Sequence, residues 1–155
     1  MAGMRALGRV YDVVPAGAAA TAVTVCLKDV SGVGILATAG ATATGTLTFT
    51  ASTLFTGGTT SNVTPANGFG QPNTWYLRSA TGTVSWAAQA ASWASNVLTI
   101  GATSGNVSYV DYLVSGLADT YDYLTVTPGA AVTITAILYD LNVQRKPQNL
   151  RIPSA

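Results

Sequence analysis

The stretch TLTFTA, residues 46–51, alternates polar and apolar side chains at every position. Successive side chains of an extended strand point to opposite faces, so Leu47, Phe49 and Ala51 share one face and the threonines share the other. A period of two with one apolar and one polar face is typical of antiparallel sheet packed on a core. The stretch therefore predicts a strand of a layered β protein.

The same period occurs in the runs on either side of this stretch. In TAVTVCL, residues 21–27, Val23, Val25 and Leu27 share one face. Branched and aromatic residues, which favour pleated structure, fill the other runs. Clusters of Gly, Pro, Asn and Ser separate them. The pattern predicts about eight to ten strands, near residues 9–14, 20–29, 33–39, 43–51, 74–79, 82–89, 96–101, 106–115, 121–127 and 131–144.

The number and spacing of these runs predict an all-β fold. We expect an antiparallel two-sheet sandwich, jelly-roll-like, with irregular N- and C-terminal arms. The length of 155 residues fits one domain with a sizeable core. The expected organisation is an N-terminal arm at residues 1–8, a β-sandwich domain at 9–144 and a C-terminal tail at 145–155.

Three segments leave the local structure open. Residues 87–95, AAQAASWAS, also suit a short helix, because Ala, Gln and Trp tolerate one. The last run, 131–144, carries apolar side chains first on one face and then on the other. This indicates either a strand covered on both faces or a bulge near Ala136–Leu138. Residues 57–73 lack any periodicity, and we expect an exposed loop there at one end of the sandwich.

The composition indicates a surface that is covered in an assembly. Charged residues make up 8% of the chain, against about 25% in average proteins, and so low a charge favours association over a monomeric state. The net charge of +1 lacks the excess of positive charge that is typical of nucleic-acid-binding proteins. No apolar run is long enough to span a membrane, and the first residues show no signal peptide. We expect neither nucleic acid nor a membrane as partner.

The residue types exclude most catalytic machinery. The chain has no His and no Glu, which removes the commonest general base, the Ser–His–Asp triad and His-based metal sites. Cys26 is the only cysteine, so an intrachain disulfide and a Cys-based zinc site are excluded. Gly32-Val-Gly34 lacks the third glycine and the helix of a dinucleotide motif. We predict no enzymatic activity, no catalytic residue, no cofactor and no metal site.

Two weaker candidates for ligand binding remain. Asp119 and Asp122 bracket a turn and could supply oxygen ligands to calcium, whereas a turn hydrogen bond and a contact with solvent or a cation explain them more simply. Trp75 and Tyr76 follow the long loop and could form a sugar-stacking platform. Tryptophans of β domains more often anchor cores or subunit interfaces.

The positive charge is concentrated at the two ends of the chain. Five of the seven Lys and Arg residues lie before residue 10 or after residue 144. Irregular ends become ordered when something binds them, and arginine offers a fork that suits carboxylates. Pro147 and Pro153 keep the tail from joining the sheet. The expected partner-binding set is Arg5, Arg9, Arg145, Lys146, Leu150, Arg151 and Ile152.

Three segments carry a resemblance to a known family: TYDYLTVTP at 120–128, AILYDLNVQRKPQNL at 136–150 and, more weakly, LKDVSGVG at 27–34. They resemble segments of small structural proteins of tailed bacteriophages, the capsid decoration or cement proteins. The resemblance implies a jelly-roll body, commonly trimeric, that sits on an icosahedral head and stiffens it. For residues 139–150 it implies packing or capsid contacts and no chemistry.

The leading hypothesis is therefore a non-enzymatic capsid decoration or cement subunit at the virion surface, made in the host cytoplasm. Its expected partners are the major capsid protein and further copies of itself, as a homotrimer. One alternative is a glycan- or receptor-binding sandwich of a head fibre or tail fibre. Another is a tail or adaptor structural subunit.

Overall fold

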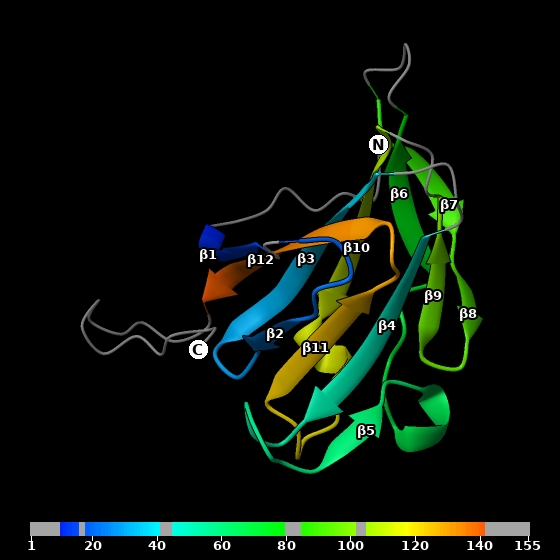
Figure 1. Ribbon diagram of the computed structural model, residues 1–155. Coiled ribbons are helices and arrows are strands. Elements are labelled where there is room, and N and C mark those ends of the chain that lie inside the picture. The colour runs from blue at the N-terminus through cyan, green and yellow to red at the C-terminus, as the bar shows by residue number, and fades with distance from the viewer. Residues whose placement is uncertain (1–9, 16–17, 41–44, 80–84, 102–104, 142–155) are drawn as a thin grey trace.

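The computed structural model describes residues 10–15, 18–40, 45–79, 85–101 and 105–141, and these form a sandwich of two antiparallel sheets (Figure 1). The order within sheet A is β1-β12-β3-β10-β6-β7, and within sheet B it is β2-β11-β4-β9-β8, with β5 beside β4. The elements are β1 (Val10–Pro15), β2 (Val23–Cys26), β3 (Val30–Ala39), β4 (Gly45–Ser52), β5 (Thr60–Asn62), η1 (Pro65–Asn67), β6 (Thr74–Arg78), β7 (Ala87–Ala90), β8 (Ser92–Ala94), β9 (Val97–Ile100), β10 (Val107–Leu113), η2 (Val114–Gly116), β11 (Tyr123–Pro128) and β12 (Val132–Leu141).

The strand pairing follows a jelly roll. β1 pairs with β12, β2 with β11, β3 with β10 and β4 with β9, as if one long hairpin had been rolled into two layers. β5 to β8 form the far end of that hairpin and extend both sheets. This topology confirms the predicted fold class, and every predicted range overlaps a strand of the structure. Residues 9, 43–44, 82–84 and 142–144 of those ranges lie outside the described residues, and β5 and β8 were not predicted.

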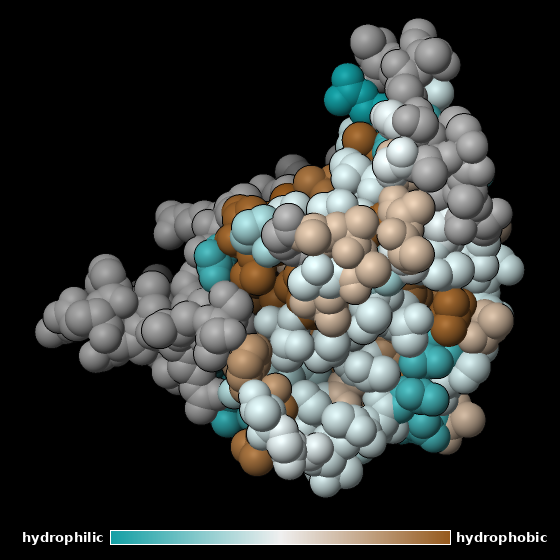
Figure 2. Space-filling view, viewed as in Figure 1, coloured by the Kyte–Doolittle hydropathy of each residue, from teal (hydrophilic) through white to brown (hydrophobic). Residues whose placement is uncertain are grey.

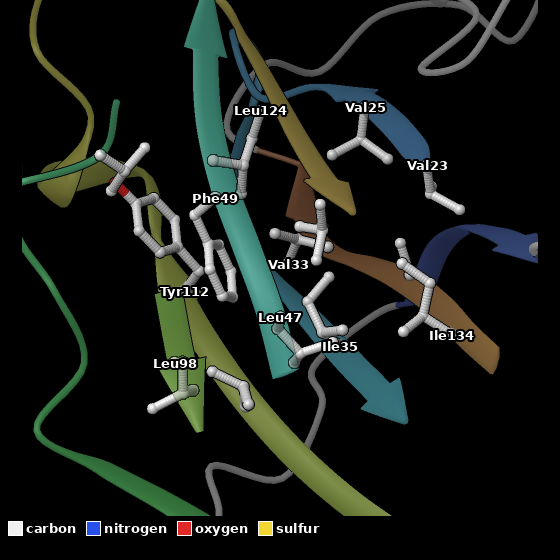
Figure 3. Packing of buried hydrophobic residues seen from close by; sticks show 14 of the residues in the cluster. Val23, Val25, Val33, Ile35, Leu47, Phe49, Leu98, Tyr112, Leu124 and Ile134 are labelled. Atoms are coloured by element: carbon white, nitrogen blue, oxygen red, sulfur yellow. The ribbon is translucent and has the colours of Figure 1, made fainter. Parts of the chain in front are cut away.

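The core lies between the sheets and is filled by the apolar face of each strand. Leu47 and Phe49 of β4, Ile35 of β3 and Leu124 of β11 have no exposed surface. Figure 3 shows these side chains meeting between the two layers, with Ile134 of β12 beside them. The apolar face of TLTFTA therefore packs on the core, as the alternation in the sequence predicts.

β12 lies between β1 and β3, so both of its edges are paired along most of its length. Its core face is buried at Val132, Ile134, Ala136 and Leu138, and its outer face is half-buried until Tyr139, which is buried. Its register with β3 is continuous from Val132 to Tyr139, which excludes the alternative of a bulge at residues 136–138 in that pairing. The irregularity lies instead on the other edge, where the register with β1 shifts between Val10 and Asp12. Asp140, near the end of β12, has a left-handed φ of 51°.

Residues 57–73 are more structured than the expected open loop. They include β5 and η1, and they bury Val63 and Phe69 in the core. The Gln71 side chain secures this segment, because its Nε2 donates to the carbonyl oxygens of Val63 and Ser95, both at 2.7 Å. Apolar residues at positions without periodicity therefore anchor the segment to the sandwich.

Residues 87–95 form two short strands, so the alternative of a helix is wrong. β7 pairs with β6 at the edge of sheet A, and β8 pairs with β9 at the edge of sheet B. The chain crosses between the sheets at Ala91, whose N–H donates to the carbonyl of Asn73 at 2.9 Å. Trp93 is half-buried, and its indole N–H donates to the carbonyl of Pro72 at 2.8 Å. Pairing with existing sheet edges outweighs the helical preference of Ala and Gln.

Candidate functional site

All seven residues of the predicted partner-binding set lie outside the described residues. They are Arg5, Arg9, Arg145, Lys146, Leu150, Arg151 and Ile152. The expected arms at 1–8 and 145–155 also lie outside them. The candidate surfaces that can be described are therefore those of the sandwich.

Trp75 and Tyr76 point to opposite faces of sheet A. The Trp75 ring belongs to the core, is only 7% exposed, and stands close to Gly101. Its faces are covered by protein, so the expectation of a sugar-stacking ring at Trp75 requires correction. Tyr76 lies on the outer face and is half-buried beside Tyr109, with ring centroids 6.4 Å apart.

The outer face of sheet A carries an aromatic cluster, which we define as Tyr76, Trp86, Tyr109 and Tyr139. Trp86 meets Tyr109 edge to face at 6.3 Å. Tyr109 and Tyr139 are 3% and 2% exposed although they lie on the side away from the core. This cluster makes the outer face of the sheet a second site of dense packing.

Two glycines of β3 make room for this aromatic cluster. A Cβ at Gly34 would stand 2.6 Å from Cε2 of Tyr109, and a Cβ at Gly32 would stand 2.5 Å from the Tyr139 hydroxyl oxygen. The two rings therefore lie against bare backbone of β3. Glycine is required at both positions because any larger residue would occupy the space of a ring.

Asp111 of β10 lies next to this cluster and is half-buried. The Tyr139 hydroxyl donates a hydrogen bond to its Oδ1. Burial is the main cause that raises the pKa of the Tyr109 phenol, and the nearby Asp111 carboxylate and Tyr76 raise it further. Burial also raises the pKa of Tyr112, whose hydroxyl donates to the carbonyl of Gly116 at 2.9 Å.

A cavity of about 310 Å³ opens beside Asp111. It is lined by residues 70–72, by residues 111–113 of β10 and by Ser115 and Gly116. Among the described residues β6 pairs with β10 only at Val107–Tyr109, so the edge of β10 beyond Tyr109 borders the cavity. The N–H of Gly70 donates to the carbonyl of Gly116 at 2.8 Å and joins the two walls. The volume falls at the small end of the range for ligand sites.

The outer face of sheet B is different in chemistry. Thr24, Thr125 and Thr50 lie in register across β2, β11 and β4, and the hydroxyls of Thr24 and Thr125 are 2.8 Å apart. Figure 2 views the molecule from this side and shows a surface of mostly intermediate hydropathy over β4 and β11. The polar half of the alternation thus forms a neutral, hydroxyl-rich face.

Asp119 and Asp122, the two residues considered for calcium binding, have the simpler surroundings that the sequence also suggests. Asp122 forms an ion pair with Lys28, with 3.6 Å between Oδ2 and Nζ. Asp119 is exposed. Over the described ranges, no three His, Cys, Asp or Glu side chains gather as a metal site would require.

The chain matches no family model, no curated protein and no solved structure. Within the described part of the chain, no helix has the length and apolar character needed to cross a membrane. The candidate site is therefore defined by the fold and its side chains alone.

Sequence reasoning missed the Asp111 cavity and the aromatic cluster. Gly32 and Gly34 alternate with Val33, a signal that one face of the strand must accommodate something large. Which rings fill that space depends on the pairing of β3 with β10 and β12, whose residues are far away in the chain. Local periodicity carries no information on that pairing.

Proposed function

We propose that this protein is a non-enzymatic structural subunit of a virus particle, a capsid decoration or cement protein that binds the head as a homo-oligomer. The observation that carries the proposal is the separation of charge between body and ends. The described body holds six aspartates and two cations, a net charge of −4, whereas the two ends hold five cations and no acid. Such a chain presents opposite charges in different parts of one molecule.

The fold and composition support the same function. Jelly rolls build viral capsid and lectin domains, among others, so the fold alone leaves the function open. The chain adds an unusually low charge content and a neutral threonine face, features that suit a subunit covered by neighbours. A subunit that binds only the assembled particle stabilises it by mass action.

Deletion of residues 145–155 tests the proposal. We expect the truncated protein to keep its circular dichroism spectrum and melting temperature, because all the described strands lie before residue 142. We expect it to lose binding to particles, measured by co-sedimentation and electron microscopy. A matched control replaces Lys28, a cation of the body, with Gln. Full occupancy of particles by the truncated protein would refute the proposal.

The same images distinguish the alternatives. Density on the faces of the head supports a decoration protein, whereas rings or helical polymers support a tail or adaptor subunit. Retention on a glycan array would favour the receptor-binding sandwich, although burial of Trp75 leaves Tyr76 as the only one of the two predicted stacking residues on the outer face.

A further inference from the structure

The outer face of sheet A is apolar on most of its strands. The strand registers place on this face, beside the aromatic cluster, the side chains of Val13, Leu36, Ala88, Val107, Leu113 and Ile137. Val13 is 49% exposed, Ala88 is exposed, and the other four are half-buried. Sheet B presents threonines on its outer face instead. The exposed apolar surface is therefore concentrated on one side of the sandwich, as it is at interaction sites.

Among the described residues, the strands of this face contribute one cation and one carboxylate to it. Arg78 of β6 and Asp111 of β10 both point outward, because Trp75 of β6 and Tyr112 of β10 point into the core. Arg78 is exposed and has no ion-pair partner within the described part of the chain. It lies opposite Val107, four residues along β10 from Asp111, which is about 13 Å on a strand.

This placement of charge makes the face complementary to a second copy of itself. Tyr76 and Tyr109 are opposite each other, midway along the strands between Arg78 and Asp111. When two identical faces pack against each other, the two-fold axis lies in the plane of the interface. An axis that crosses the strands over the two tyrosines places Arg78 of each copy opposite Asp111 of the other. That axis is nearly perpendicular to the strands, so the strands of the two sheets stay nearly aligned, as in other stacked sheets.

The size of the face is sufficient for a specific interface. Sheet A has six strands, and β10 has seven residues. At about 4.8 Å between strands and about 20 Å along β10, the face covers about 500–600 Å². Two copies would bury about 1,000–1,200 Å² in total, which reaches the area of about 1,000 Å² that specific interfaces require. Aromatic side chains would occupy the centre, where they contribute most to binding.

We propose that two copies of this chain pack through the outer faces of sheet A and form a two-fold dimer. Tyr76 and Ala88 lie at the axis and meet their own counterparts, while Arg78 and Asp111 form two equivalent ion pairs on either side. The inference rests on the proposed function for the role of this dimer, since it specifies the homo-oligomer that binds the particle. A two-fold dimer replaces the homotrimer that the family resemblance implies.

Sedimentation velocity of the full-length chain over a wide range of concentrations tests the dimer. Ala88→Glu places two carboxylates against each other at the axis, and we expect it to weaken association at least about tenfold. Thr127→Glu is the matched control, because it adds the same carboxylate at an exposed strand position on the outer face of sheet B. It should associate as the unaltered chain does. Thermal melts verify that both variants are folded.

Exchange of charges tests the proposed pairing of Arg78 with Asp111. Arg78→Glu opposes two carboxylates on each side of the axis, and Asp111→Lys opposes two cations. Each variant alone should therefore dimerise at least about tenfold more weakly. Mixed together, they restore an opposite-charge pair on both sides and should form a heterodimer. Asp111→Lys also removes the acceptor of the Tyr139 hydroxyl, so if it fails to fold, Ala88→Glu and Arg78→Glu decide the question.

Three results would overturn the inference. The first is an unaltered chain that stays monomeric, as it would if another part of the same chain covered the face, or that sediments as a trimer. The second is a dimer that Ala88→Glu or Arg78→Glu leaves intact. The third is a pair of folded charge variants that do not combine.

Particle binding, measured on the same proteins, separates this inference from the proposed function. An unaltered chain that is monomeric and still binds particles refutes only the dimer. A chain that dimerises through sheet A but never binds particles refutes only the proposed function.

Discussion

Gly34→Ala tests whether the outer face of sheet A is packed as tightly as a core. The added Cβ would stand 2.6 Å from Cε2 and 2.8 Å from the hydroxyl oxygen of Tyr109, where ordinary contact begins at 3.4 Å. The ring has to move by close to an ångström. It is 3% exposed and is flanked by Trp86 and Tyr76, so it has no free space to enter.

The expected cost follows from these distances. Overpacking of this kind destabilises the folded state by about 1–3 kcal/mol. Ala also restricts the backbone of the unfolded chain more than Gly does, which stabilises the protein by about 0.4–1 kcal/mol. The net destabilisation should be about 1–2 kcal/mol. For a domain of this size that lowers the melting temperature by about 2–8 °C, at about 2–4 °C per kcal/mol.

Gly40→Ala is the matched control, since its Cβ would meet only the carbonyl oxygen of Ala131 at 3.7 Å. Calorimetry and urea unfolding should show it as stable as the unaltered chain or slightly more stable. A second arm places Gly34→Ala in a Tyr109→Val background, where the ring is gone and the substitution should become neutral. Equal melting temperatures for Gly34→Ala and Gly40→Ala would contradict this prediction. So would a destabilisation by Gly34→Ala that persists in the Tyr109→Val background.

Two further predictions concern buried side chains. Burial raises the pKa of Tyr109 and Tyr112 above the unfolded value of 10.0, so their stabilisation is complete below pH 10 and is lost as the pH rises through the folded values. The urea midpoint should fall above pH 10, and less so in the Tyr109→Phe, Tyr112→Phe double variant; equal slopes in both proteins would contradict this. Trp75→Ala should lower the free energy of unfolding by about 3–5 kcal/mol because the ring is in the core, whereas exposed Arg78→Ala on the same strand should change it by less than about 0.5 kcal/mol. Comparable urea midpoints for these two variants would show that the Trp75 ring is not buried.

The charged ends and the absence of catalytic residue types were available from the sequence, and so was the layered fold. Alternation such as that in TLTFTA is a local property, because the geometry of one extended chain sends neighbouring side chains to opposite faces. Turn residues then divide the chain into strands of the right length. Those two local signals were sufficient to predict a two-sheet sandwich and the position of most strands.

Local signals could not decide which strand lies beside which, or which of two faces is inside. In TWYLR both Trp75 and Tyr76 are plausible outward residues, and only the packing of the two sheets assigns Trp75 to the core. Asp111 and Tyr139 are 28 residues apart, and they meet because β3 pairs with both of their strands. The cavity exists because β6 leaves β10 after three pairs. Strand pairing joins residues that are distant in the chain, and for that physical reason the tertiary structure alone located the site.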